Sequence, residues 1–116
     1  MALVLVVDDE ALVRMNAVDM MEQAGHNVIE AANADEAIRH LESRTDIEIV
    51  FSDVTMPGSM DGLRLLQVIR DRWPPIRLIL VSGKTLPEGS NPPAGSVFLR
   101  KPYDFGDVTS ALERAA

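Results

Sequence analysis

Reactive side chains stand at or just after the ends of four short apolar runs in this sequence. In chain order they are two neighbouring acids, a third acid, a hydroxyl and an amine: Asp8, Asp9, Asp53, Ser82 and Lys101. If the four runs are parallel strands of one sheet, their carboxyl ends share an edge and these groups meet there. Converging carboxylates suit a hard cation such as Mg²⁺, which keeps several waters and so leaves room for a phosphate. The sequence therefore predicts a magnesium and phosphate site.

The elements that must position these groups alternate along the chain. Short apolar runs alternate with stretches of helical period, the pattern of repeated β–α units in an α/β domain. The expected strands are 4–7, 27–31, 47–52, 76–81 and 97–99, and the expected helices are 10–24, 33–44, a third between Asp61 and Trp73, and 104–114. Right-handed crossovers place helices on both faces of such a sheet. We therefore expect a flavodoxin-like, doubly wound sheet of five parallel strands in the order 2-1-3-4-5.

Local signals mark where helices begin and where a helix is disfavoured. Asn33 with Glu36 three residues later is the pattern of a capping box, and Asp61 and Asp104 are candidates for helix N-caps. The segment 84–95 contains three prolines and two glycines. Each weakens a helix, proline by about 3 kcal/mol at an interior position. We expect a loop there, with at most one irregular turn.

Composition limits the size, partners and compartment of the protein. A chain of 116 residues is about one domain, so residues 1–116 are expected to form a single unit. The net charge of −7 disfavours nucleic-acid binding, and no apolar run approaches the roughly 20 residues that cross a bilayer. There is no cysteine for a disulfide or a thiolate metal site, and the first residues lack a secretory signal. The cytoplasm is the expected compartment.

Each reactive residue, taken singly, also has an ordinary structural explanation. Asp8 and Asp9 suit the start of a helix, as a cap and as a charge that the helix dipole favours. Asp53 and Ser82 are common turn formers, and Lys101 is a base before a loop proline. Their shared position at one edge of the sheet is what favours a functional site.

Four segments of the sequence resemble the signature blocks of bacterial response regulator receiver domains. They are Val6-Val7-Asp8-Asp9-Glu10, Ser52-Asp53-Val54-Thr55-Met56-Pro57-Gly58, Val81-Ser82-Gly83 and Phe98-Leu99-Arg100-Lys101-Pro102-Tyr103. The resemblance extends from about Leu3 to Leu112. It implies a phosphoprotein of two-component signal transduction, often part of a phosphorelay, which works with a sensor histidine kinase or a phosphotransfer protein.

The resemblance implies how the phosphoryl group is accepted. Asp53 would attack a phosphoryl group carried by a histidine kinase or a small donor and become an aspartyl phosphate. Mg²⁺ would be held by Asp9, Asp53 and the main-chain carbonyl of Thr55, with Asp8 acting through a bound water. The ion neutralises charge on the transferring group, which is the main electrostatic help that phosphoryl transfer needs.

The resemblance also implies how the modification is sensed. Lys101 would contact Asp53 before the reaction and a phosphoryl oxygen afterwards, and Ser82 would donate a hydrogen bond to another. Phe98 would then turn inward to fill the space that Ser82 vacates, although a plain core aromatic is the alternative. The bond between Lys101 and Pro102 is expected to be cis, a geometry almost confined to proline.

One departure from the family pattern bears on signalling. Receivers of this family have a regular fourth helix where this chain has residues 84–95, so we expect that helix to be shortened or replaced by a loop. The output surface is then altered, and one hypothesis is that the loop itself becomes ordered on phosphorylation. The resemblance also implies that Thr55 and Lys84 occupy positions that tune the lifetime of the phosphoryl group, with a solvated surface lysine as the alternative for Lys84.

The sequence thus favours a receiver that catalyses only its own phosphorylation and dephosphorylation and switches protein–protein interactions. Because no output domain follows Ala116, we expect it to stand alone and to act on a protein target. Two alternatives stay open: a receiver-shaped scaffold that never takes phosphate, and an Mg²⁺-dependent phosphohydrolase with an aspartyl nucleophile. The hydrolase normally has a second acid where this chain has Thr55, and the scaffold would lack the acids or the lysine.

Overall fold

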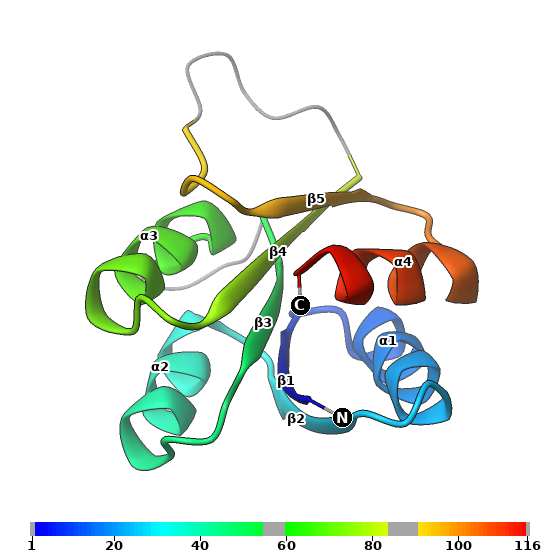
Figure 1. Ribbon diagram of the computed structural model, residues 1–116, viewed down its shortest axis with the longest axis horizontal. Helices are drawn as coiled ribbons and strands as arrows, with labels where there is room; N and C mark the ends of the chain where they lie inside the picture. Colours follow the sequence, from blue (N-terminus) through cyan, green and yellow to red (C-terminus); the bar gives the residue numbers. More distant parts are fainter. Residues whose placement is uncertain (1, 55–59, 84–90, 116) are drawn as a thin grey trace.

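A parallel five-stranded sheet forms the centre of the molecule (Figure 1). The computed structural model describes residues 2–54, 60–83 and 91–115. The strands are β1 (Leu3–Val7), β2 (Asn27–Ala31), β3 (Ile49–Asp53), β4 (Arg77–Ser82) and β5 (Val97–Arg100), and the helices are α1 (Ala11–Gln23), α2 (Ala34–Ser43), α3 (Gly62–Arg72) and α4 (Phe105–Ala115). The strand order is β2-β1-β3-β4-β5, and every neighbouring pair is parallel. The predicted flavodoxin-like order is confirmed.

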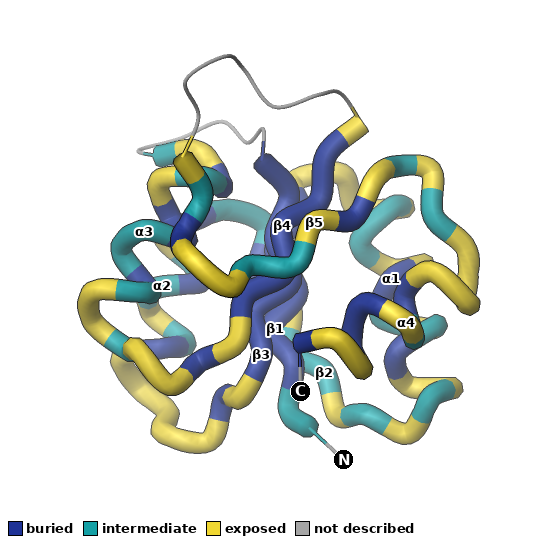
Figure 2. Tube along the Cα trace, turned by 45° about the horizontal axis from the view of Figure 1, so that its top comes forward, coloured by how far each residue is buried: buried dark blue, intermediate teal, exposed yellow. Residues whose placement is uncertain are grey.

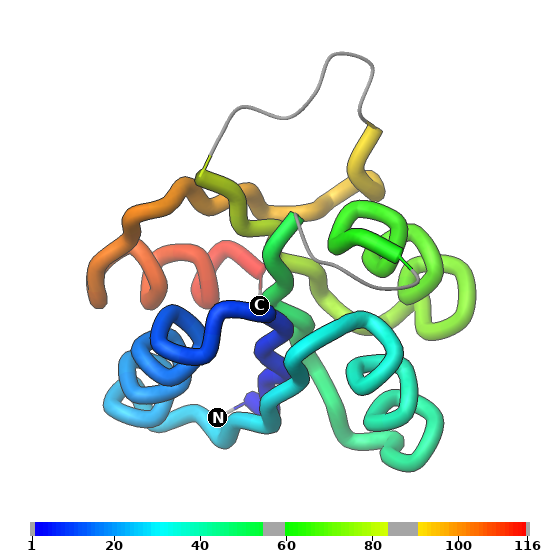
Figure 3. The backbone as a smooth tube through the Cα atoms, turned by 180° about the vertical axis from the view of Figure 1, so that it is seen from behind, coloured from blue at the N-terminus to red at the C-terminus, as the bar shows by residue number. Residues whose placement is uncertain are grey.

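Among the described helices, α2 and α3 cover one face of the sheet and α1 and α4 the other, as both Figure 1 and the view from behind in Figure 3 show. Successive residues of β1 face opposite sides, so Leu5 and Val7 join the core under α2 and α3, while Val4 and Val6 join the core under α1 and α4. The three central strands, β1, β3 and β4, are therefore buried almost throughout, whereas the edge strands β2 and β5 are only partly buried (Figure 2). This accounts for the unbroken apolar runs in the sequence.

The predicted helix caps are confirmed. The side chain of Asn33 accepts a hydrogen bond from the Glu36 N–H, and the side chain of Asp61 accepts one from the Arg64 N–H. Asp104 and Asp107 cap the start of α4 reciprocally, because the side chain of each accepts the backbone N–H of the other. The polar residues before α2, α3 and α4 therefore place the first turns of these helices, whereas no side chain among the described residues caps α1.

Two other features qualify what the sequence predicts. Helical spacing puts Phe105 on the inner face with Val108 and Leu112, which are buried, but Phe105 is exposed because the first turn of α4 lies away from the sheet (Figure 1). Between β4 and β5, the described residues 91–96 contain a turn and no helix. Residues 84–90, with Lys84, lie outside the described part of the chain. No helix among the described residues is long and apolar enough to span a membrane.

Candidate functional site

Four of the predicted residues meet at the carboxyl edge of the sheet. Asp8 follows β1, Asp53 ends β3, Ser82 ends β4, and Lys101 follows β5. Asp8 and Asp53 are only 4% and 7% exposed, and Ser82 is similarly buried. Burial of two carboxylates costs free energy unless a cation or hydrogen-bond donors accompany them. The edge is therefore built around charge compensation.

Lys101 provides that compensation. Its Nζ lies 3.0 Å from Asp53 Oδ2, 3.2 Å from Asp8 Oδ2 and 3.7 Å from Glu10 Oε1. Burial by itself would lower the pKa of Lys101, but the hydrogen bonds and charges of Asp53 and Asp8 outweigh it and raise that pKa above its ordinary value. The ammonium is thus charged at every physiological pH. The peptide bond between Lys101 and Pro102 is cis, as predicted.

The carboxylates at this edge have the chemistry of a magnesium site. Asp8, Glu10 and Asp53 each offer an oxygen, and these oxygens lie within 4.8 Å of one another. All are hard donors of the kind that Mg²⁺ prefers, and Lys101 already shows that the spot attracts a positive charge. Asp9 is exposed and lies outside this group in the described structure, and Thr55 lies outside the described residues.

Glu10 is a member of the cluster to which the sequence alone assigned no role. Its backbone N–H donates to Asp8 Oδ1 at 2.9 Å, which folds the chain back so that the Glu10 carboxylate faces Lys101. The sequence carries one signal for this contact. Glu10 stands two residues after Asp8, the spacing at which an aspartate side chain can accept a backbone N–H.

The start of α3 touches the backbone of Asp53 directly. The Gly62 N–H donates to the carbonyl of Val54 at 2.8 Å. A Cβ on Gly62 would lie 1.6 Å from the carbonyl oxygen of Asp53, far inside any contact distance. Only glycine fits at this place, so Gly62 sets how closely α3 approaches the end of β3.

Phe98 and Ser82 lie on neighbouring strands, where Phe98 pairs with Leu80 and Ser82 pairs with Arg100. The Phe98 side chain is 40% exposed, whereas Ser82 is buried. Phe98 is therefore not a core aromatic in this conformation, and its ring has solvent on one side. An inward rotation would remove apolar surface from water, which is favourable wherever space exists behind it.

Tyr103 closes the side of the site next to β5. Its ring meets that of Phe51 edge to face, with centroids 5.7 Å apart, and its hydroxyl is buried with no hydrogen-bond partner in the described structure. Burial, and then the negative charge of Asp8, raise the pKa of Tyr103 to about 12 from its ordinary 10.0.

We expect this shift to be measurable because Tyr103 is the single tyrosine of the chain. In the folded protein the phenol should stay neutral past pH 10 and ionise near pH 12, whereas in urea its midpoint should be about 10. Its contribution to stability is complete below the unfolded pKa and is lost as the pH rises through the folded one. Absorbance of the phenolate against pH, with circular dichroism to follow folding, checks this; a folded-state midpoint near 10 contradicts it.

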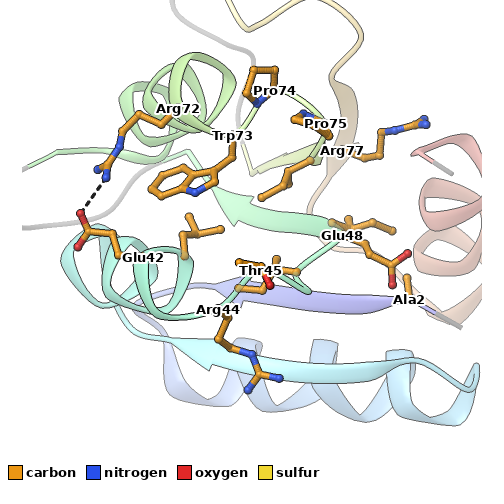
Figure 4. Close-up of a pocket in the computed structure, with 14 residues that line it drawn as sticks. Ala2, Glu42, Arg44, Thr45, Glu48, Arg72, Trp73, Pro74, Pro75 and Arg77 are labelled. Atoms are coloured by element: carbon orange, nitrogen blue, oxygen red, sulfur yellow. Dashed lines mark hydrogen bonds and ion pairs between the residues drawn. The ribbon is translucent and has the colours of Figure 1, made fainter.

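Of two hollows in the described structure, the larger is remote from the acids. It measures about 670 Å³ and lies where β1, β3 and β4 begin, at the opposite edge of the sheet (Figure 4). Among the residues that line it, Arg72 pairs with Glu42 and stacks on Trp73. The smaller hollow, of about 450 Å³, lies between α1 and the start of the β5–α4 connection and is lined by Glu10, Lys101 and Tyr103 among others. It is therefore the one that opens beside the acids.

A doubly wound parallel sheet with buried acids and a lysine at its carboxyl edge defines a flavodoxin-like domain of the receiver type. The sequence model of the response regulator receiver domain matches residues 4–113. The chain belongs to this family, and it is a response regulator receiver domain of two-component signalling.

Its relatives include proteins much longer than this chain. The sensor kinase CckA of Brucella abortus (strain 2308) is 38% identical in a 116-residue alignment that covers 97% of this chain and 12% of the kinase. A putative NtrX-like response regulator of Rickettsia bellii (strain RML369-C) is 32% identical over 97% of this chain and 24% of its own length. The chain thus spans a quarter or less of these two relatives.

Solved structures agree on the fold. The receiver domain of the hybrid histidine kinase CckA superposes with a TM-score of 0.82 at 31% identity, covering 98% of both chains. The chemotaxis response regulator CheY4 of Vibrio cholerae gives a TM-score of 0.87 at 27% identity, covering 100% of this chain and 99% of that one.

Proposed function

We propose that this chain accepts a phosphoryl group on Asp53 in an Mg²⁺-dependent reaction and thereby switches its interactions with other proteins. The observation that supports this best is the buried carboxylate of Asp53, 3.0 Å from Lys101 and grouped with Asp8 and Glu10 at the edge of the sheet. A scaffold has no need of so costly a group of buried charges. The phosphoryl donor is a sensor histidine kinase or a phosphotransfer protein, and the family supports both.

Three residues and one main-chain carbonyl would hold the metal. By family resemblance, the direct ligands are the side chains of Asp9 and Asp53 and the main-chain carbonyl of Thr55. Asp8 acts through a bound water. The carboxylate of Glu10 adds negative charge at the same place. The ion supplies electrostatic stabilisation for the charge that develops on the transferring group.

The chain's own residues perform the remaining steps. An oxygen of Asp53 forms a bond to phosphorus while the bond from phosphorus to the donor nitrogen breaks, and that nitrogen keeps the electron pair. Lys101, already at hydrogen-bond distance from Asp53, then donates to a phosphoryl oxygen instead. Ser82 donates to another. The reaction therefore modifies the protein itself and turns over no other substrate.

The added charge supplies the switch. A phosphoryl group brings about −1.5 to −2 charges to an edge that already contains several carboxylates. Movement of Ser82 toward the new oxygens makes room for Phe98, whose half-exposed ring gains burial by turning inward. The surface around β5 then changes shape, and a target protein that prefers one shape responds to phosphorylation.

Exposed apolar side chains beside the acids provide a surface for the protein donor. Leu12 is 77% exposed and Met15 is also exposed, both in the first half of α1, which follows Asp8 to Glu10. We expect Leu12→Ser with Met15→Ser to slow transfer from a histidine kinase that phosphorylates the parent by about tenfold, the effect of about 1.4 kcal/mol at an interface. Phosphorylation by acetyl phosphate, which needs no docking surface, should keep its rate. Equal slowing with both donors contradicts a docking role.

One experiment tests the proposed function directly. The parent and Asp53→Asn are incubated with acetyl phosphate and Mg²⁺, and their intact masses are followed. We expect the parent to gain one phosphoryl group when Mg²⁺ is present and none when the metal is chelated. Asp53→Asn should gain none in either condition. No gain in the parent supports the scaffold, whereas steady turnover of several phosphomonoesters supports the hydrolase.

A further inference from the structure

Arg14 links three elements around the acidic loop. It lies in α1, one turn after Glu10, and its side chain is only 18% exposed. One end of its guanidinium, Nη1, donates to the main-chain carbonyl of Asp8 at 2.7 Å. Its Nε donates to Glu30 Oε1 on β2 at 3.0 Å. A planar fork that binds in two directions is a capability that lysine lacks.

The carbonyl of Asp8 depends on this contact. The other polar groups of Asp8 have partners: its N–H donates to the Ala31 carbonyl, Oδ1 accepts from the Glu10 N–H, and Oδ2 accepts from Lys101. β1 ends at Val7, so the carbonyl of the next residue lies beyond the strand ladder. In a buried residue an unsatisfied carbonyl costs about 1 to 3 kcal/mol. Arg14 removes that cost.

The same contact sets the direction of the peptide that leads to Asp9. A peptide unit is planar, so the oxygen of Asp8 and the nitrogen of Asp9 turn together. Holding that oxygen against Arg14 fixes the plane from which Asp9 leaves the loop. The Glu10 N–H bonded to Asp8 Oδ1 holds the next peptide. Asp9 is therefore flanked by two restrained peptide units although its own side chain is exposed.

We propose that Arg14 is a positioning residue for the metal-binding loop: through the Asp8 carbonyl it orients Asp9, and through Glu30 it anchors the loop to β2. The inference rests on the proposed function, because it assigns Arg14 a part in Mg²⁺ binding. Residues that orient metal ligands from outside typically change metal affinity by 10- to 100-fold when they are replaced. Arg14 should act on Mg²⁺ affinity more than on the reaction once Mg²⁺ is bound.

The test is calorimetric titration of Mg²⁺ into the unphosphorylated protein. We expect Arg14→Gln and Arg14→Lys to bind Mg²⁺ about 10-fold more weakly than the parent, since neither side chain can hold Asp8 and Glu30 together. Glu30→Gln keeps Arg14 as the donor to the Asp8 carbonyl, so its Mg²⁺ affinity should fall less. Arg39→Gln, at an exposed arginine of α2, is the matched control and should bind as the parent does.

Two further measurements separate positioning from simple stabilisation. Urea unfolding shows whether each variant is folded under the titration conditions, and Arg14→Lys provides a milder change if Arg14→Gln is not. At low Mg²⁺ the Arg14 variants should be phosphorylated by acetyl phosphate more slowly than the parent. At saturating Mg²⁺ their rate should recover to that of the parent. Unchanged Mg²⁺ affinity in folded Arg14 variants, or a rate that saturating Mg²⁺ does not restore, overturns the inference. If the parent itself neither binds Mg²⁺ nor takes phosphate, it is the proposed function that fails.

Discussion

Replacing Gly62 with alanine is expected to destabilise the folded chain by about 3 kcal/mol, toward the upper end of the usual cost of overpacking a core. The new Cβ would lie 1.6 Å from the carbonyl oxygen of Asp53 and within about 3 Å of the Val54 Cα, both of them backbone atoms. No rotation of a side chain relieves such a contact. Either α3 moves outward, breaking the bond from the Gly62 N–H to the Val54 carbonyl, or the end of β3 moves.

Either movement displaces the phosphoacceptor, so Gly62→Ala should also accept phosphate more slowly. Gly106→Ala is the matched control, because its Cβ would approach nothing closer than an Asp104 oxygen at 3.4 Å, on the exposed first turn of α4. There alanine should stabilise the chain by about 0.5 to 1 kcal/mol, the usual gain over glycine in a helix. Urea unfolding and the intact-mass assay check both variants. A Gly62→Ala protein as stable and as reactive as the parent would show that α3 does not constrain Asp53.

The helix caps and the strands could be predicted from the sequence because each depends mainly on residues close together in the chain. A cap such as Asn33 or Asp61 acts within four residues, and the structure confirms both. The buried strands were visible as apolar runs, since a parallel sheet covered on both faces admits few polar residues. Once the strand order is known, the residues at strand ends, Asp53 and Lys101 among them, must share an edge.

Each contact that the sequence did not predict depends on where a particular side chain or backbone group points in the folded chain. Glu10 joins the acids because its N–H bonds to the side chain of Asp8. Arg14 looks like an ordinary polar position on α1 until its guanidinium is seen at the Asp8 carbonyl. Gly62 left one signal, because glycine weakens the first turn of a helix and needs another reason to be there. That reason is the carbonyl of Asp53, a contact that only the packed fold produces.

Replacing Lys101 with methionine is expected to have the largest effect on the site itself. Methionine keeps an apolar stem of similar length but removes the ammonium 3.0 Å from Asp53 and 3.2 Å from Asp8. Removal of one partner from a buried ion pair costs about 3 to 5 kcal/mol when the other charge stays buried. Because Lys101 is partly open to water, we expect about 3 kcal/mol, the lower end of that range.

The sign of the magnesium effect distinguishes this cause from a packing defect. Without Lys101 the acids lack their nearest cation, so Mg²⁺ should stabilise Lys101→Met more than it stabilises the parent, as urea unfolding with and without the ion can measure. A packing defect would lower the free energy of unfolding by the same amount with and without Mg²⁺. Phosphorylation by acetyl phosphate should remain about 100-fold slower even at saturating Mg²⁺, since a donor aimed at the transferring group is missing. Full recovery of that rate by Mg²⁺ would mean that Lys101 serves only as a counter-ion for Asp53 and Asp8.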